Sequence, residues 1–264
     1  MAASHLFSTE AVVLKRSDFG EADRIITLYT PHLGKMRAIA KGVRRTTSRL
    51  SGHVELFIHS NMLIAKGRNL DIITQSENIH SFARLRDDLW RTSYAYYAGE
   101  MLDQFTEDGL ENFPAWELLL KTFERIAESR DPELAVRFFE VHLLAHLGYR
   151  PQLHNCVHCH AQVGPTGNFF AAASGGVLCL ECGQSDPGAR GMTSNGFKML
   201  RLLQSGDYTM ASRVRLDQGL RRELRGVMRG YIEYILERAL KSASFLDILH
   251  EENRGNSSPR QAVV

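Results

Sequence analysis

Four cysteines in two closely spaced pairs constrain this chain more than any other feature of its sequence. They are the chain's only cysteines, and they form Cys-x2-Cys, a gap of nineteen residues, and a second Cys-x2-Cys: Cys156, Cys159, Cys179 and Cys182. Two such pairs on tight turns place four thiolates at the corners of a tetrahedron, which is the geometry of a structural zinc site. Four sulfur ligands leave no open coordination position. The sequence therefore predicts one structural Zn²⁺ per chain.

Other roles for these cysteines fit the sequence less well. Two disulfides would need an oxidising compartment, and the start of the chain lacks the charged and apolar regions of a secretory signal. A redox dithiol would need only one pair, between a strand and a helix. His154, His158 and His160 lie beside the first pair, but with four thiols present we expect them to be bystanders. Gly183 directly follows the second pair and is expected to relieve backbone strain in its turn. The residue directly after the first pair is His160.

Residues 1–80 show a pattern of short strands separated by turn residues. The runs are rich in β-branched and aromatic residues, and a sheet this small buries its inner face most simply as a closed barrel. We expect an SH3-like or OB-type barrel of five or six strands, with candidates at residues 11–15, 24–30, 35–41, 54–59, 62–66 and 71–75.

The rest of the chain is expected to be mainly helical around the cysteine module. In residues 81–151 we expect a helix over 83–105, with Leu85, Leu89, Tyr96 and Leu102 in a helical pattern, a second from Pro114, and a third between Asp131 as N-cap and Gly148. The module covers 152–192, helices return over 193–250, and 251–264 is expected to be a disordered tail. The predicted class is thus α+β and multidomain. No apolar run approaches the roughly 20 residues that a membrane span needs.

Charge is distributed unevenly along the chain. Residues 1–80 carry 11 Lys and Arg against 7 Asp and Glu, a net +4, while 81–150 carry 8 against 13, a net −5. Residues 151–264 carry 13 against 10, a net +3. This asymmetry favours an anionic partner at the two ends of the chain.

The strongest basic segment begins on the third expected strand and continues into the loop after it. We call it the basic ridge, and it has six members with no acid among them: Lys35, Arg37, Lys41, Arg44, Arg45 and Arg49. In a strand, alternation places the first three outward and Met36, Ala38 and Ala40 inward, and the last three lie on the following loop. Such a ridge suits a DNA phosphate backbone, and the alternative is a solvated strand face.

A second basic segment lies on a helix near the C-terminus. Arg221, Arg225 and Arg229 recur every four residues, with Arg222 beside them. This face is either a second DNA contact or an ordinary solvated arginine face.

Motifs of common enzymes are missing from the sequence. There is no G-x4-G-K-S/T phosphate loop, no His-Glu-x2-His and no G-x-S-x-G. We therefore expect a non-catalytic DNA-binding protein. Two other classes stay open: a zinc-ribbon DNA-processing enzyme such as a nuclease, and a scaffold that binds only proteins.

Two long N-terminal segments resemble the RecO family of recombination mediators. They are residues 19–30, from Phe19-Gly20-Glu21-Ala22-Asp23-Arg24, and residues 34–45, from Gly34-Lys35-Met36-Arg37, followed by Ser48-Arg49. The cysteine pairs and the stretch Ser242 to Leu249 are similar to that family too.

The resemblance implies an N-terminal OB-fold, a helical domain and a zinc-binding insertion. It also implies binding to single- and double-stranded DNA, annealing of complementary strands, partnership with RecR, contact with single-stranded-DNA-binding protein (SSB), and indirect help in loading RecA in the bacterial cytoplasm, near the nucleoid. For the acidic, apolar C-terminal tail of SSB we expect a pocket in the helical region at Arg125, Arg130 or Arg137. Candidate base-stacking aromatics in the barrel are few, namely Phe19, Tyr29 and Phe57, so electrostatics should outweigh stacking.

Overall fold

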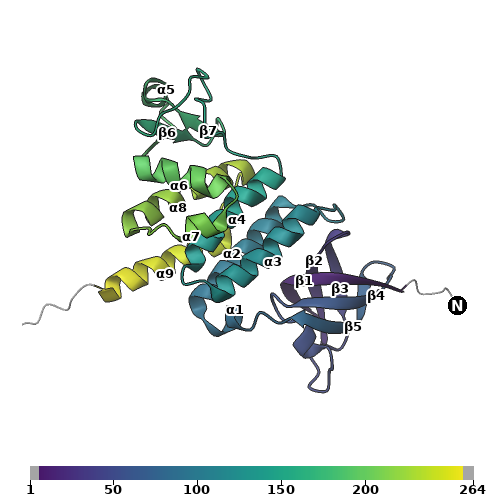
Figure 1. Ribbon diagram of the computed structural model, residues 1–264. Helices are drawn as coiled ribbons and strands as arrows, with labels where there is room; N and C mark the ends of the chain where they lie inside the picture. Colours follow the sequence, from purple (N-terminus) through teal and green to yellow (C-terminus); the bar gives the residue numbers. More distant parts are fainter. Residues whose placement is uncertain (1–5, 258–264) are drawn as a thin grey trace, which may run out of the picture.

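A β-barrel, a helical body and a small cysteine module follow one another through the molecule (Figure 1). The computed structural model describes residues 6–257, with side chains to residue 252. The barrel lies at one end, the helices occupy the middle, and the module lies at the opposite end (Figure 1). Within the described residues, no helix combines the length and the apolar character needed to cross a membrane.

Five strands close the N-terminal barrel in the order β1-β2-β3-β5-β4. Neighbouring strands are antiparallel except β3 and β5, which pair in parallel. This is the five-stranded Greek-key closure of an OB-fold, as predicted. The strands are β1 (Leu6–Phe19), β2 (Asp23–Thr30), β3 (Gly34–Ala40), β4 (His59–Ala65) and β5 (Asp71–His80).

Of the six candidate strands, the one between β3 and β4 is not formed, and the barrel has five strands. Residues 54–59 were expected to form a strand of their own, separate from the next, but β4 already begins at His59 and residues 54–58 are not in a strand. The connection instead contains a short 3₁₀ helix, η1 (Ser51–His53), and its apolar side chains fill two cores. Val54 is buried in the barrel and Phe57 against the helices. The apolar residues of this connection are therefore explained by burial of their side chains in these two cores and not by strand pairing.

Strand β1 joins the barrel to the helical body. Ala11 and Val13 belong to the barrel core, whereas Val12 and Leu14 belong to the core of the helices. The register of β1 against β2 shifts between Val13 and Lys15, which marks a β-bulge at this point. Because both faces of β1 are buried here, apolar packing is continuous between the two parts.

Four helices follow the barrel, and side-chain caps set the starts of the last three. They are α1 (Arg84–Asp87), α2 (Leu89–Phe105), α3 (Phe113–Glu128) and α4 (Pro132–His146). The single helix expected over 83–105 breaks at Asp88, whose backbone is extended and whose carboxylate caps α2 at the Arg91 amide. Asp131 accepts from the Leu134 amide and caps α4, which confirms the predicted start.

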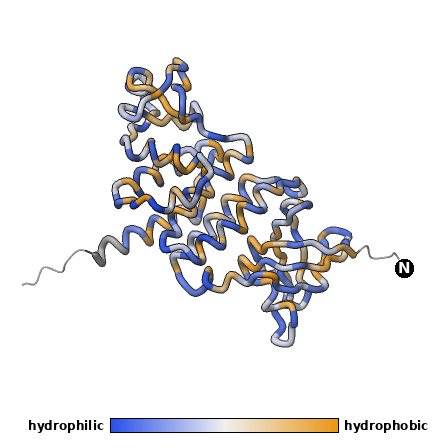
Figure 2. Tube along the Cα trace, viewed as in Figure 1, coloured by the Kyte–Doolittle hydropathy of each residue, from blue (hydrophilic) through white to orange (hydrophobic). Residues whose placement is uncertain are grey.

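The cysteine module is a three-stranded sheet with a short helix, and four helices follow it. The module contains β6 (Asn168–Ala171), β7 (Gly176–Leu178), α5 (Leu180–Ser185) and β8 (Arg190–Met192), in the sheet order β7-β6-β8. The returning helices are α6 (Ser194–Gln204), α7 (Tyr208–Ser212), α8 (Gln218–Leu236) and α9 (Lys241–Ser257). Polar and apolar residues alternate along these elements (Figure 2), as expected where each has one buried face.

The C-terminal segment differs from its expected disorder. Helix α9 continues through Ser257, so residues 251–257 of the expected tail are helical, and 258–264 lie outside the described residues.

Candidate metal centre and nucleic-acid interface

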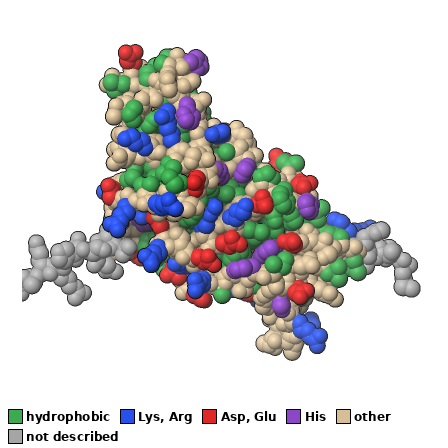
Figure 3. All heavy atoms as spheres, viewed as in Figure 1, with side chains coloured by type: hydrophobic (Ala, Val, Ile, Leu, Met, Phe, Trp, Pro, Cys, Tyr) green, Lys and Arg blue, Asp and Glu red, His purple; other side chains and the backbone are tan. Residues whose placement is uncertain are grey.

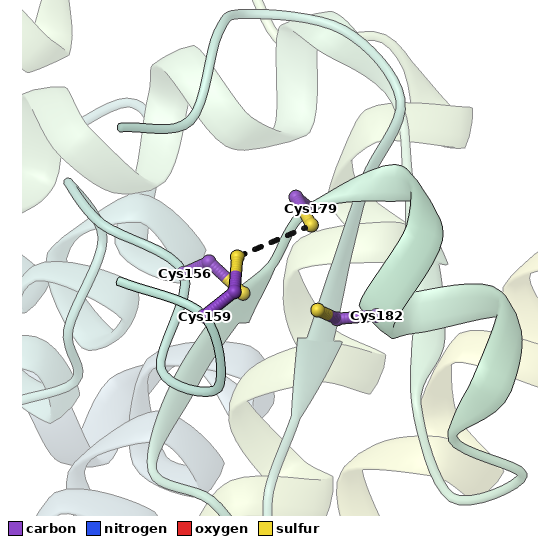
Figure 4. Close-up of side chains that lie close together, drawn as sticks. All are labelled: Cys156, Cys159, Cys179 and Cys182. Atoms are coloured by element: carbon purple, nitrogen blue, oxygen red, sulfur yellow. Dashed lines mark hydrogen bonds between the residues drawn. The ribbon is translucent and has the colours of Figure 1, made fainter. Parts of the chain in front are cut away.

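The four cysteine sulfurs meet at one point of the module (Figure 4). All four cysteines are free thiols, and their Sγ atoms lie within 4.8 Å of one another. Cys159 Sγ and Cys179 Sγ are 3.8 Å apart. A tetrahedron with Zn–S bonds of about 2.3 Å has sulfur–sulfur edges of about 3.8 Å, so the arrangement fits a tetrahedral ion. The cluster could hold a metal ion, and the four thiols are the donor set that zinc prefers.

Each cysteine pair lies on a backbone turn, and the residue that follows the pair meets a different structural need in each case. After the first pair, the His160 amide donates to the Cys156 carbonyl at 2.9 Å, and His160 adopts a left-handed backbone conformation at φ 63°. After the second pair, Gly183 is needed for a different reason from the one expected. Its φ is not positive, but a Cβ there would lie 2.3 Å from the Phe169 ring. The glycine therefore permits close packing of α5 on β6.

Backbone N–H groups prepare Cys156 to bind a cation. Burial opposes ionisation of this thiol, but the amides of Cys159, Cys179 and His158 point at its sulfur and lower its pKa to about 6. Hydrogen bonding with Cys179, together with burial, raises the pKa of Cys182. Four thiolates this close repel one another, so their joint ionisation requires a bound cation. His154, His158 and His160 are exposed and do not belong to the cluster.

Helix α6 anchors the module to the body. Arg201 donates from Nε to the Leu153 carbonyl at 2.8 Å and from Nη2 to the Val163 carbonyl at 3.4 Å. These carbonyls flank the first cysteine pair. The cysteine cluster is thereby tied to the helices, far from the barrel (Figure 1).

The expected alternation of β3 is present in the barrel. Ala38 and Ala40 are fully buried in its core, and Met36 packs against that core. Arg37 points outward and is exposed, and Lys41 is exposed directly after the strand. The inward positions predicted for Met36, Ala38 and Ala40 are therefore confirmed.

Lys35 is directed away from the rest of the basic ridge. Its side chain is only 12% exposed, and its Nζ lies 3.2 Å from the Asp103 carboxylate. The same Nζ donates to the Asp103 and Thr106 carbonyls at 2.6 and 2.7 Å. Lys35 thus binds the C-terminal end of α2, and its charge stabilises the barrel–helix contact. Of the six cations expected to form the basic ridge, Lys35 therefore has no charge free to bind an anion.

The other ridge members differ in how far their charges are neutralised. Arg37 lies 3.5 Å from Asp108, and Arg44 lies 3.5 Å from Asp18. In the described part of the chain, no ion pair is found for three exposed members, Lys41, Arg45 and Arg49. We refer to Lys41, Arg44, Arg45 and Arg49 as the basic loop. It is the exposed part of the ridge after β3, and three of its four charges have no ion pair in the described residues.

The arginines of α8 are engaged within the protein. Arg221 binds Asp131 through two hydrogen bonds, of 2.8 and 2.6 Å, and Arg225 binds Glu133 at 2.6 Å. Arg229 pairs with Glu233 and Asp247, and Arg222 is the exposed member of the set. On the face drawn in Figure 3, basic side chains of the helical body likewise lie among acidic ones. This arginine face holds α8 to α4 and α9. The sequence had suggested either a second DNA contact or a solvated face, and neither interpretation predicted this role.

The three arginines considered for the SSB tail have different surroundings. Arg137 is buried and pairs with Glu140 at 2.9 Å. Arg125 is half-buried between the rings of Phe138 and Tyr208, and one of its buried nitrogens has no hydrogen-bond partner in the structure. Arg130 is exposed.

Aromatic side chains are exposed in places that the sequence pattern did not indicate. Tyr29 and Phe57 are buried, so Phe19, at 50% exposure, is the accessible one of the three barrel candidates. In the helices, Leu85 and Leu102 are buried as their pattern suggests, but Tyr96 is 44% exposed. The helix expected over 83–105 is also interrupted at Asp88. That break was signalled by Asp87-Asp88, which are poor helix-interior residues.

Comparison with known proteins matches both halves of the chain. The family described as Recombination protein O N terminal matches residues 1–82, and Recombination protein O C terminal matches residues 86–244. A protein of Roseiflexus sp. (strain RS-1) named DNA repair protein RecO is 42% identical over 252 residues, which cover 96% of this chain and 89% of that protein. A Dehalococcoides mccartyi (strain BAV1) protein of the same name is 37% identical over 94% of this chain and 98% of its own length.

An OB barrel, a helical body and a four-cysteine module define a class of barrel-and-helix proteins with a candidate structural metal centre. Within that class, the chain belongs to the RecO family.

Proposed function

We propose that this chain is a non-enzymatic recombination mediator in DNA repair. It binds single- and double-stranded DNA through the basic loop, anneals complementary strands, and acts with RecR to help load RecA onto SSB-coated DNA. The observation that carries this proposal is the set of exposed cations with no ion pair in the described structure, Lys41, Arg45 and Arg49, on one loop of an OB barrel. The names of the relatives, DNA repair protein RecO, support the same process.

Annealing needs no covalent chemistry, and the basic loop suits that role. Two complementary strands repel each other through their phosphates, and cations on one surface reduce this repulsion. Contacts to phosphate carry little sequence information, so binding should show no strong sequence preference. The barrel's interior aromatics are buried, which favours an electrostatic mode for the loop itself.

The metal ion would act in folding rather than in catalysis. We propose Zn²⁺ at Cys156, Cys159, Cys179 and Cys182, because four thiolates are the preferred closed ligand set of structural zinc. Its binding energy would stabilise the module's two turns, because metal binding and folding are coupled in such sites. DNA repair of this kind would take place in the cytoplasm at the nucleoid.

For the SSB tail we propose a site at Arg125, with Arg130 nearby in the sequence. A guanidinium between two aromatic rings, with one nitrogen lacking a partner in the structure, suits a carboxylate next to an apolar side chain. Arg137 suits this role less well because its charge is already paired with Glu140.

One experiment separates the proposed function from the two alternatives. Purified protein is titrated into labelled single- and double-stranded DNA over a range of salt concentrations, and the same mixtures are incubated with Mg²⁺ and examined for cleavage. A mediator binds with strong salt dependence, anneals complementary strands and leaves them intact. Cleavage would support the nuclease, and absence of salt-dependent binding would support the protein-only scaffold.

A further inference from the structure

A groove separates the outer side of β1 from helices α2 and α9. It has a volume of about 710 Å³, and its walls include Leu14 and Lys15 from β1, Tyr96 from α2 and Phe245 from α9. Ligand sites commonly enclose about 300–1,000 Å³, so a nucleotide-sized group can enter. The groove lies where the barrel meets the helical body, away from the cysteine cluster.

Two aromatic rings are exposed in the walls of this groove. Tyr96 is 44% and Phe245 is 46% exposed. The ring of Tyr96 rests edge-on against the buried Phe57 ring, with centroids 5.1 Å apart, which holds it in place. OB-fold proteins commonly bind single strands by stacking bases on aromatic side chains. The barrel's own Tyr29 and Phe57 are buried, and the groove supplies the aromatic faces that the barrel lacks.

The charge available in the groove is positive. Its three carboxylates are all engaged: Glu100 by backbone amides of α9, Asp103 by Lys35, and Asp18 by Arg24. Lys15 and Lys241 also line the groove, and both are exposed. Across residues 6–257, no ion pair is found for either lysine. The surface therefore combines aromatic rings with free cations, which is the combination that single-stranded nucleic acids require.

The groove is continuous with the basic loop. Asp18 lines the groove and pairs with Arg24 at 3.0 Å and with Arg44 of the basic loop at 3.5 Å. The Arg44 amide also donates to the Ala22 carbonyl at 2.9 Å, so the loop packs on the β1–β2 turn. The half-exposed Phe19 lies at this turn. The basic loop and the groove therefore meet at the β1–β2 turn, where Asp18 is paired with both arginines.

We propose that single-stranded DNA runs from the basic loop into this groove, where unpaired bases stack on Tyr96 and Phe245 and phosphates contact Lys15 and Lys241. This inference rests on the proposed DNA binding by the loop. A duplex cannot use the groove in this way, because its bases are already paired and stacked. The groove therefore gives the protein a preference for unpaired strands that phosphate contacts alone do not provide.

Stacking and phosphate contact are distinguished by their salt dependence. Affinity for an oligo-dT strand is measured over a salt series for the wild type, Phe245→Ala and Tyr96→Leu. Each variant should bind about tenfold more weakly, because stacking contributes roughly that much per base. The salt slope should not change, since no counterion release is removed. Affinity for a duplex should equal that of the wild type, and Phe245→Trp should restore single-strand binding.

Two further measurements complete the test. Wild-type protein should bind a strand with abasic positions more weakly than oligo-dT, and Phe245→Ala combined with Tyr96→Leu should bind both alike. Lys15→Ala with Lys241→Ala should instead lower the salt slope by about one unit for each phosphate that is no longer neutralised. Tyr234→Ala is the matched control, because this tyrosine is 54% exposed on α8 and does not line the groove.

The outcomes separate this inference from the proposed function. Single-strand affinity unchanged in Phe245→Ala and Tyr96→Leu would overturn the groove as a DNA site, as would an equal loss of duplex affinity. Unchanged single-strand affinity is also the result expected if the groove binds a peptide. A wild-type protein that binds no DNA, or binds without salt dependence, would overturn the proposed function itself.

Discussion

Glu100 on α2 caps the N-terminus of α9 at Ser242, although the two residues are far apart in the sequence. One carboxylate oxygen accepts from the Lys241 amide at 3.0 Å, and the other accepts from the Ser242 amide at 2.8 Å and from the Ser242 hydroxyl. The residue before α9 is Leu240, which has no side-chain acceptor of its own. A negative charge at this position also interacts favourably with the helix dipole. The cap fixes the start of α9, and with it the position of Phe245.

Glu100→Ala should therefore lower the free energy of unfolding by about 1 kcal/mol, the usual cost of losing a helix cap. Denaturant-induced unfolding measures this, with Glu107→Ala as control because Glu107 is exposed on the following loop. Equal stability of the Glu100→Ala and control proteins would show that α9 does not depend on this cap.

The metal site gives a second prediction. Purified protein should contain one zinc per chain, and Cys179→Ser should lose the metal and unfold the module, since binding and folding are coupled in such sites. Elemental analysis and limited proteolysis of residues 152–192 measure the two effects. His158→Ala should keep its zinc because His158 is outside the sulfur cluster. Zinc-free protein, or disulfides under native conditions, would contradict the prediction.

Features determined by neighbouring residues were predictable from the sequence, whereas pairings between distant segments were not. Asp131 followed by Pro132 signals a helix start locally, and the cysteine spacing brings four sulfurs together through two local turns. Lys35 looks like any outward strand residue, because its partner Asp103 lies 68 positions further along the chain. The same holds for Arg225 and Glu133, whose ion pair crosses between α8 and α4.

The groove illustrates the same limit in the candidate site. Its walls come from β1, α2 and α9, so no single stretch of sequence contains it. Tyr96 occurs in an apolar pattern that predicts burial as readily as exposure, and only the position of α9 beside α2 decides between them.

Buried Glu140 should make the stability of the protein depend on pH. It lies among α2 and α4 side chains, pairs with Arg137 and accepts from the Tyr97 hydroxyl at 2.5 Å. Burial raises its pKa to about 6, against 4.5 when exposed. The folded state thus binds a proton more tightly than the unfolded state. This contribution to stability is fully present below pH 4.5 and is lost as the pH rises through about 6.

Unfolding free energies of wild type and Glu140→Gln are compared between pH 5 and pH 7. The wild type should lose about 1 kcal/mol more than the variant over this rise, because the amide does not titrate. The comparison cancels the histidines common to both proteins. Parallel profiles would mean that Arg137 keeps Glu140 ionised throughout.

The proposed SSB-tail site predicts a specific loss of peptide binding. Arg125→Ala should weaken binding of a synthetic acidic, apolar tail peptide by about tenfold, since a charge-assisted hydrogen bond contributes about 1.5–3 kcal/mol. Fluorescence titration of the labelled peptide measures this, and Arg213→Ala, an exposed arginine after α7, is the control. Unchanged binding in Arg125→Ala, or no binding by the wild type, would reject the site.

The basic loop and the α8 arginines predict opposite results for matched double substitutions. Arg44→Ala with Arg45→Ala removes two charges from an exposed loop, so DNA affinity should fall and the salt slope should decrease by about one unit for each phosphate left without its cation. Annealing should decline in parallel. Zinc content should not change and unfolding free energy should change little, because both side chains lie at the surface and an ion pair there, such as Arg44–Asp18, contributes at most about 1 kcal/mol. Arg221→Ala with Arg225→Ala instead leaves Asp131 and Glu133 without their partners. Glu133 is 6% exposed, and a buried carboxylate without its cation costs several kcal/mol. That variant should be clearly less stable, yet its folded fraction should bind DNA with the wild-type salt slope. If the α8 variant loses the slope and the loop variant keeps it, the DNA surface lies on the helical body and not on the barrel.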